Sequence, residues 1–270
     1  MAMDKVNSHG LVLLGCGKMG SALLAGWLGR GVAREAVWVL EPNPSEWLIA
    51  QGVHLNQGLP ASPAVCVLAV KPQMMGAALP SIVALGNGPT LFLSIAAGTT
   101  IATFAAILGA ETPIVRAMPN TPAAVGRGIT ALVANQQAGT QCLALAQELM
   151  AAVGQVVLLD HEAQMDAVTA VSGSGPAYVF HLIEAMAAAG EAEGLSAAMA
   201  MQLARATVCG AGELAYQATE SAAQLRINVT SPSGTTAAAL AVLMEPETGF
   251  PGLLKRAVAA AAARGRELGQ

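Results

Sequence analysis

A glycine-rich turn, residues 15–20, has the residue types and spacing of a phosphate-binding loop. It reads GCGKMG, follows the apolar run 11–14 and precedes a helical pattern over 18–29. In such a turn the first glycine permits the bend, the second lets a pyrophosphate approach the backbone, and the third lets helix and strand pack closely. The free N–H groups of the helix also favour an anion. The turn predicts a dinucleotide site made by Gly15, Cys16, Gly17, Lys18, Met19 and Gly20.

An acidic residue, Glu41, follows the second predicted strand, 37–40. It lies about twenty residues beyond the glycines, where a carboxylate accepts hydrogen bonds from the adenosine ribose and repels a 2′-phosphate. Glu41 therefore favours NAD, although Asn43 and Ser45 nearby would still tolerate NADP. The alternative is a solvated strand end with no ligand.

Two further polar positions follow predicted strands. Lys71 and Pro72 end the continuous apolar run 65–70, which is typical of a parallel strand buried on both faces. Asn120 lies in a stiff loop between two prolines, after the predicted strand 115–118. Ligands bind outside the carboxyl ends of such strands, so both positions are candidates for the site. The alternatives are a lysine that snorkels at the sheet edge and ordinary turn chemistry.

A second candidate site lies in the loop 230–236, TSPSGTT, which has five hydroxyl side chains around a proline and a glycine. At the start of a predicted helix, these hydroxyls and the backbone N–H groups suit a small carboxylate. The alternative is a helix N-cap, which needs only one serine or threonine.

These residues are positioned by an alternation of strands and helices that ends near residue 160. Strands are predicted at 11–14, 37–40, 65–70, 91–95, 115–118, 126–133 and 155–159, with helices at 18–29, 44–51, 101–108 and 141–153. Beyond His161 only helical patterns occur, over 177–192, 197–218, up to 243 and over 252–268. The prediction is an α/β, Rossmann-type doubly wound domain over 1–160, followed without a linker by an all-α domain over 161–270.

Composition excludes several classes. Hydrophobic residues make up 54% and charged residues 11%, which indicates helices covered by other subunits. The net charge of −4 without a basic run argues against nucleic acid. The most apolar window, 91–110, is broken by Gly98 and two threonines, so we expect a strand and a short helix and no membrane span.

The cysteines and histidines point to a reducing compartment and to no metal. The four cysteines form no C-x-x-C pair and no signal peptide is recognised, so we expect free thiols and a cytoplasmic protein. The four histidines have no ligand-like spacing, and no metal site is predicted.

Six segments together resemble the pyrroline-5-carboxylate reductases, in the order and near the spacing of that family and over almost the whole chain. The segments are GCGKMG (15–20), AVKP (69–72), SIAAGTT (94–100), MPNTP (118–122), AVSGSGPAY (170–178) and NVTSPSGTT (228–236). The last two together are specific, whereas many dehydrogenases share the first. The resemblance implies reduction of 1-pyrroline-5-carboxylate to L-proline with NADPH or NADH, the last step of proline biosynthesis.

The resemblance also implies roles for residues and a partner. The cofactor would contact the glycine loop, Glu41, Asn43, Ala69, Val70, Lys71, Pro72, Ala97 and Asn120. Ser231, Gly234 and Thr235 would hold the substrate carboxylate, and Thr236, the assigned catalytic residue, would hydrogen-bond the ring nitrogen. The helical domain, 161–270, would dimerise so that the substrate loop of one chain serves its partner's cofactor. Rings of dimers also occur in the family.

Two rivals remain. A β-hydroxyacid dehydrogenase shares the G-x-G-x-M-G start and a helical second domain, but it has a lysine on the long helix, and this chain has none between Leu159 and Leu254. A dinucleotide-sensing protein without turnover would not need the hydroxyl-rich loop. A related cyclic imine as substrate is compatible with the same features.

Overall fold

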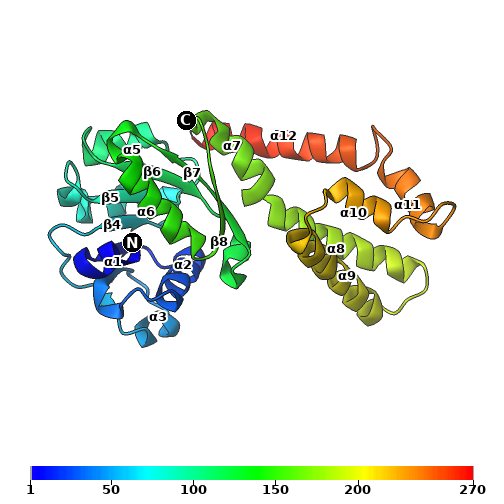
Figure 1. The fold of residues 1–270 in the computed structure, drawn as a ribbon, viewed down its shortest axis with the longest axis horizontal. Helices are drawn as coiled ribbons and strands as arrows, with labels where there is room; N and C mark the ends of the chain where they lie inside the picture. Colours follow the sequence, from blue (N-terminus) through cyan, green and yellow to red (C-terminus); the bar gives the residue numbers. More distant parts are fainter. Residues whose placement is uncertain (1, 270) are drawn as a thin grey trace. The chain divides into compact units, whose positions relative to one another are not determined.

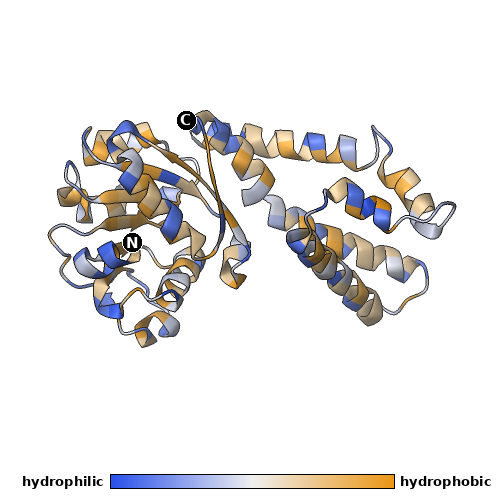
Figure 2. Ribbon diagram, in the orientation of Figure 1, coloured by the Kyte–Doolittle hydropathy of each residue, from blue (hydrophilic) through white to orange (hydrophobic). Residues whose placement is uncertain are grey.

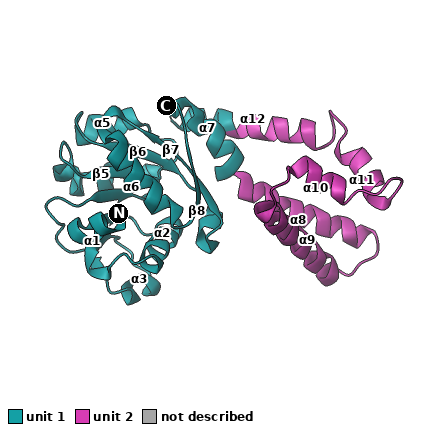
Figure 3. Cartoon of the chain, viewed as in Figure 1, with its two compact units in different colours: residues 1–173, 262–270 teal, residues 174–261 magenta. Residues whose placement is uncertain are grey.

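The chain forms two compact units in a computed structural model that describes residues 2–269. Residues 1–173 with 262–270 make the first unit, and residues 174–261 make the second (Figure 3). Strands give way to helices after Leu158. The domain boundary placed at residue 160 stays a prediction.

The first unit is built on one eight-stranded sheet with the order β3-β2-β1-β4-β5-β6-β7-β8. All neighbouring strands are parallel except β6 and β7, which are antiparallel. The strands are β1 (Leu11–Leu14), β2 (Val37–Leu40), β3 (His54–Leu55), β4 (Val65–Leu68), β5 (Leu91–Ser94), β6 (Ile114–Met118), β7 (Gly128–Ala134) and β8 (Gly154–Leu158). Strands β2 and β3 are added on one side of β1, and β4 to β8 are added on its other side. This change of side between β1 and β4 confirms the predicted doubly wound α/β domain.

Helices cover both faces of the sheet (Figure 1). The helices are α1 (Ala2–His9), α2 (Lys18–Gly29), α3 (Glu46–Ala50), α4 (Met75–Ala78), α5 (Ile101–Leu108), α6 (Gly139–Ala151) and α7 (Met165–Val168). On one face Leu13 packs with Trp27 of α2 and Leu149 of α6, and on the other Val12 packs with Phe104 of α5. The strands β1, β4, β5 and β6 are buried along their whole length, as continuous apolar runs require.

The second unit is helical throughout its described residues, as predicted. It contains α8 (Gly175–Ala192), α9 (Ala197–Gln217), α10 (Ala222–Asn228), α11 (Thr235–Leu243) and the first part of α12 (Phe250–Leu268). Ala187, Ala200 and Ala204 are buried between α8 and α9, where small side chains let the helices approach closely. None of the helices described here is long and apolar enough to cross a membrane.

Several features of the fold were not predicted from the sequence, including the short helices α4 and α7. Helix α1 has few apolar positions, β3 has only two residues, and α10 is short and polar. The antiparallel direction of β7 was also not predicted, because an apolar run does not carry the direction of its strand. The predicted strand 65–70 ends earlier, at Leu68.

Candidate active site

The glycine-rich turn joins β1 to α2, and its three glycines differ in their surroundings. Gly15 has φ +88°, and a Cβ there would lie 2.7 Å from Cγ1 of Val70. A Cβ on Gly20 would lie 2.7 Å from the carbonyl oxygen of Gly15, so the helix starts in close contact with the turn. A Cβ on Gly17 would meet nothing within 4 Å. The turn therefore leaves room at its second glycine, where a pyrophosphate would approach, and its shape fits a dinucleotide.

The other residues of the turn differ in exposure. Lys18 is exposed in the first turn of α2, whereas Met19 packs against the core of the first unit. The Cys16 side chain is buried beside Ser21, whose hydroxyl donates to the Cys16 carbonyl at 3.1 Å. Burial raises the pKa of the Cys16 thiol, which therefore remains neutral near pH 7.

The Glu41 carboxylate lies against this turn. Its Oε2 accepts a hydrogen bond from the backbone N–H of Cys16 at 2.8 Å, and its Oε1 accepts one from the N–H of Asn43 at 3.0 Å. The structure thus places Glu41 at the turn with Asn43 beside it, and the contact of both residues with a cofactor stays a prediction. Ser45 is occupied elsewhere, since its hydroxyl accepts from the N–H of Leu48 and caps α3.

Sequence reasoning missed Asn56, which follows β3. Its amide oxygen accepts from the N–H of Glu41 and its amide nitrogen donates to the Glu41 carbonyl, both at 2.9 Å. No periodicity marks this residue. The only signal was an asparagine after a short strand, a residue type that tolerates the left-handed conformation found here, φ +51°.

The residues after β4 and β5 lie at the same edge of the sheet as the turn. Ala69, Val70, Lys71 and Pro72 follow β4, which pairs with β1, and Ala97 follows β5, which pairs with β4. Lys71, Pro72 and Ala97 are exposed. The amide of Ala69 donates to the carbonyl of Leu14 at 2.8 Å, which fixes this segment beside the end of β1.

Asn120 is nearly buried and its side chain is engaged within the first unit. Its Oδ1 accepts from the N–H of Ile129 at 2.9 Å, and its Nδ2 donates to the carbonyl of Ser172 at 3.1 Å. Ser172 belongs to a π-helical turn, Thr169–Gly173, a local structure that is frequent at functional sites. The structure therefore gives Asn120 a role in tying this turn to the sheet, and its contact with a cofactor stays a prediction.

A buried ion pair, also missed, fixes the start of α5. Arg116 of β6 donates from Nη1 to Oε1 of Glu162 at 2.8 Å, and the same oxygen accepts from the N–H of Ile101 at 2.9 Å. The pair thus anchors the helix that follows the predicted cofactor residue Ala97. A charged residue inside an otherwise apolar strand was the signal that could have revealed it.

In the second unit the loop 230–236 leads into α11, whose N-cap is Gly234 and whose first residue is Thr235. No side chain caps this helix, so capping does not account for the hydroxyls. The Thr230 hydroxyl donates to the carbonyl of Arg226 at 2.6 Å. Among the residues that the structure describes, the hydroxyls of Ser231, Ser233, Thr235 and Thr236 have no hydrogen-bond partner. The first helical N–H groups are also unsatisfied within the helix.

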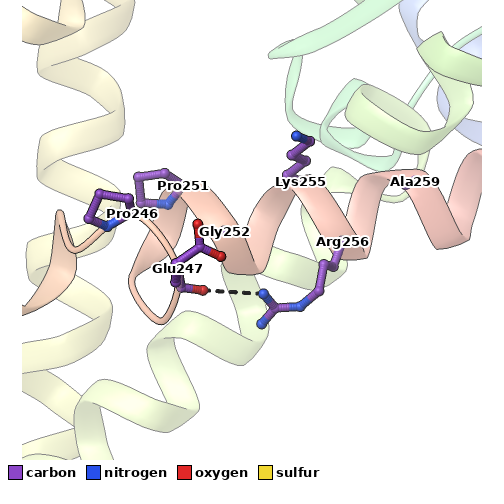
Figure 4. A pocket seen from close by; sticks show the side chains of 7 residues that line it. All are labelled: Pro246, Glu247, Pro251, Gly252, Lys255, Arg256 and Ala259. Atoms are coloured by element: carbon purple, nitrogen blue, oxygen red, sulfur yellow. Dashed lines mark hydrogen bonds between the residues drawn. The ribbon is translucent and has the colours of Figure 1, made fainter.

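Two cavities lie in the second unit. One, of about 480 Å³, adjoins this loop and is lined by Arg226, Ile227, Thr230, Ala237, Leu240, Ala241 and Met244. The other, of about 470 Å³, lies at the start of α12 and is lined by Pro246, Glu247, Pro251, Gly252, Lys255, Arg256 and Ala259 (Figure 4). Apart from Thr230, neither cavity is lined by a residue singled out from the sequence. Within residues 2–269 no group of three or more His, Cys, Asp or Glu side chains could hold a metal ion.

Comparisons with known proteins agree with the resemblance in the sequence. The family "Pyrroline-5-carboxylate reductase dimerisation" matches residues 162–268, and the family "NADP oxidoreductase coenzyme F420-dependent" matches residues 11–98. The pyrroline-5-carboxylate reductase of Pseudomonas aeruginosa is 40% identical over 266 residues, which cover 96% of this chain and 97% of the relative. That of Synechocystis sp. is 41% identical over 267 residues, covering 96% and 98%.

Solved structures are similar over the same length. The pyrroline-5-carboxylate reductase of Coxiella burnetii has a TM-score of 0.88 at 34% identity and covers 97% of this chain and 99% of its own. The Plasmodium falciparum pyrroline carboxylate reductase, solved with NADP bound, has a TM-score of 0.83 at 29% identity and covers 98% and 99%.

Proposed function

The chain belongs to the pyrroline-5-carboxylate reductase family, and from this we propose how its residues divide the work of reducing 1-pyrroline-5-carboxylate to L-proline. It is an NAD(P)H-dependent oxidoreductase of proline biosynthesis. The observation that carries this function is the 40% identity to a curated reductase over 96% of the chain. The proposal concerns the residues, the partner subunit and the compartment.

The first unit provides the cofactor half of the site. The turn from Gly15 to Gly20 would hold the pyrophosphate, and Glu41 and Asn43 would hold the adenosine ribose. Ala69, Val70, Lys71, Pro72 and Ala97, with Asn120 behind them, would line the nicotinamide end, and the bound nicotinamide supplies the hydride. The open space at Gly17 and the position of Glu41 beside the turn support this half.

The second unit provides the substrate half. Ser231, Gly234 and Thr235 would hold the carboxylate with hydroxyl and backbone N–H donors, and Thr236 would hydrogen-bond the ring nitrogen. The absence of a side-chain cap on α11 supports this half, because it leaves the donors at the start of the helix available.

These residues are sufficient for the chemistry. An imine carbon is electrophilic, and more so when its nitrogen is protonated, so hydride transfer needs mainly distance and alignment. The carboxylate is a fixed handle on the ring and Thr236 orients the N–H. This explains why the site requires no histidine or aspartate acid–base pair.

The enzyme would act as a cytoplasmic homodimer, with 1–160 binding the cofactor and 161–270 dimerising and binding the substrate. The substrate loop of one chain would serve the cofactor of its partner, and dimers would assemble further into rings. The apolar side chains exposed on the second unit support a partner subunit. The four free cysteines support a reducing compartment.

The substitution Thr236→Ala tests the assigned roles, with oxidation of NADH or NADPH in the presence of 1-pyrroline-5-carboxylate as the measurement. We expect kcat to fall by about tenfold or more, since a hydrogen bond to a charged group contributes about 1.5–3 kcal/mol. The melting temperature should change little because the hydroxyl has no partner within the chain.

The matched control is Thr219→Ala, the same chemical change in the same unit but between α9 and α10. It should retain wild-type kinetics. Turnover and affinity unchanged by Thr236→Ala would remove Thr236 from the site, and a wild-type chain without imine-dependent NAD(P)H oxidation would overturn the function itself.

A further inference from the structure

The Glu41 carboxylate is fixed in position before any ligand arrives. Both of its oxygens accept backbone hydrogen bonds, one from the N–H of Cys16 in the phosphate-binding turn and one from the N–H of Asn43. A carboxylate oxygen has more than one acceptor site, so each oxygen can still accept a hydroxyl. The negative charge is therefore fixed next to the turn and remains able to bind donors.

Asn56 holds the backbone beneath this carboxylate. Its side chain pairs with both the N–H and the C=O of Glu41, at 2.9 Å each. Its own N–H donates to the carbonyl of Val39 at 2.9 Å, which joins it to β2. Asn56 has φ +51°, a left-handed conformation that asparagine tolerates better than most residues. The Asn56 contacts thus fix Glu41 relative to the sheet.

The charge of Glu41 is not paired with a cation from its own part of the sheet. The sequence has no lysine or arginine between Arg34 and Lys71, the stretch that contains β2, α3 and β3. Glu41 makes no ion pair in the described part of the chain. A 2′-phosphate placed here would meet a fixed carboxylate with no basic side chain from this stretch to bind it. Asn43 points its N–H at Glu41, and Ser45 caps α3.

We propose that Glu41, held in place by Asn56, makes the enzyme select NADH over NADPH. Glu41 is the specificity-determining residue, because it accepts the ribose hydroxyls of NADH and repels the 2′-phosphate of NADPH. Asn56 is a positioning residue that acts through the Glu41 backbone. The inference rests on the proposed function only in that the ligand is a nicotinamide dinucleotide.

The test measures the dissociation constants of NADH and NADPH by nicotinamide fluorescence, without imine. We expect the wild-type protein to bind NADH at least about tenfold more tightly than NADPH, because the 2′-phosphate of NADPH would be repelled by the Glu41 charge. Glu41→Gln keeps the shape of the side chain and removes its charge. It should strengthen NADPH binding and bring the ratio of the NADPH and NADH dissociation constants toward one. Asn56→Gly, which accepts the positive φ but loses the side-chain contacts, should reduce the ratio by about threefold.

Asn87→Gly is the matched control. Asn87 also has a positive φ, +52°, and also accepts a backbone hydrogen bond, but it precedes β5 and so lies at the opposite edge of the sheet from the turn. In Asn87→Gly the ratio of the NADPH and NADH dissociation constants should equal that of the wild type. Each variant is first checked for an unchanged melting temperature or, for Asn56→Gly, for retained circular dichroism.

Three results would overturn the inference: equal binding of both cofactors by the wild type, an unchanged ratio in Glu41→Gln, or equal weakening of both cofactors in Asn56→Gly. The proposed function fails separately. If the protein prefers NADH in binding but never oxidises it with 1-pyrroline-5-carboxylate, the cofactor selectivity stands and the proposed function is wrong. If it reduces 1-pyrroline-5-carboxylate rapidly without a cofactor preference, the function stands and the cofactor selectivity is wrong.

Discussion

The two compact units differ in where they place their large apolar side chains. In the first unit Trp27, Phe92 and Phe104 are fully buried on the two faces of the sheet. In the second unit the buried residues are small, namely Ala187, Ala200, Ala204 and Gly249, while side chains such as Leu203, Leu214 and Val242 are exposed. The apolar colouring of α8, α9 and α11 in Figure 2 therefore includes many residues at the surface.

From this difference we expect the first unit to fold with its own residues and the second to need a partner for a stable fold. Exposed apolar patches of this extent mark interaction surfaces in soluble proteins. The match of residues 162–268 to a dimerisation family identifies a second copy of the chain as the partner. In obligate dimers, folding of such a region is inseparable from association.

A charge on the exposed apolar face of the second unit should have the largest effect. Leu214 in α9 is 56% exposed, and we expect Leu214→Glu to convert dimer to monomer and to abolish activity, because a carboxylate would be buried without a partner in each copy. Sedimentation equilibrium measures the change. Ile49→Glu in α3 of the first unit, at a residue 59% exposed, is the control and should remain dimeric. A dimeric Leu214→Glu would place the interface elsewhere.

A cavity in the core of the first unit should lower the free energy of unfolding, with a smaller effect than loss of the dimer and no dependence on protein concentration. Phe92 is fully buried in β5, and Phe92→Ala should lower the free energy of unfolding by about 3–5 kcal/mol. All three tryptophans, Trp27, Trp38 and Trp47, lie in this unit, so tryptophan fluorescence during urea unfolding reports on it alone.

The size of this loss should not depend on protein concentration. The counterpart Phe250→Ala in α12, at a residue 39% exposed, should instead shift the helical circular dichroism transition in a concentration-dependent way. Equal concentration dependence in both variants would show that the first unit also needs the partner to fold.

Breaking the buried ion pair should have the smallest effect on stability. The side chains of Arg116 and Glu162 are 5% and 29% exposed, so Glu162→Gln leaves a buried guanidinium without its carboxylate. We expect a loss of about 1–3 kcal/mol, reduced from the value for fully buried pairs because Glu162 is partly solvated. Urea unfolding followed by tryptophan fluorescence measures it.

The exposed pair His181–Glu184 in α8 of the second unit is the comparison, with side chains 82% and 70% exposed. Glu184→Gln should have no measurable effect on the urea transition followed by helical circular dichroism, because surface pairs contribute little. A loss from Glu184→Gln as large as that from Glu162→Gln would contradict the contrast between the units.

The sequence predicted the parts of the fold that depend on local patterns. The buried strands around Gly15, the helical second half and the helix start after Gly234 follow from apolar periodicity, glycines and hydroxyls, which act on neighbouring residues. Contacts between distant segments were not predictable in this way. The pairing of Asn56 with Glu41 and of Arg116 with Glu162 depends on how strands and turns are brought together, and the two residues of each pair carry no shared local signal.

The exposed apolar side chains of the second unit were likewise not predictable one by one. The sequence indicated them only through its high overall content of apolar residues. Leu214 has the periodicity of a core residue, and nothing in its neighbours distinguishes a core within one chain from an interface between two. The structure of the single chain distinguishes the two cases, because Leu214 is exposed in it and is therefore not part of a core within one chain.

We propose that the cofactor half of one chain works with the substrate half of its partner, and subunit mixing tests this directly. Gly17→Asp should fold, because the position has open space and aspartate is a good N-cap, but its charge would exclude the pyrophosphate. A second variant, Thr235→Ala with Thr236→Ala, disables the substrate loop. Each should be inactive alone.

The measurement is NADH oxidation with 1-pyrroline-5-carboxylate after the two variants are unfolded together and refolded. We predict recovery of about one quarter of wild-type activity, because random pairing makes half the dimers mixed and each mixed dimer then has one intact shared site. Activity that stays at the level of the separate variants would contradict the claim, since sites built within single chains cannot be restored by mixing.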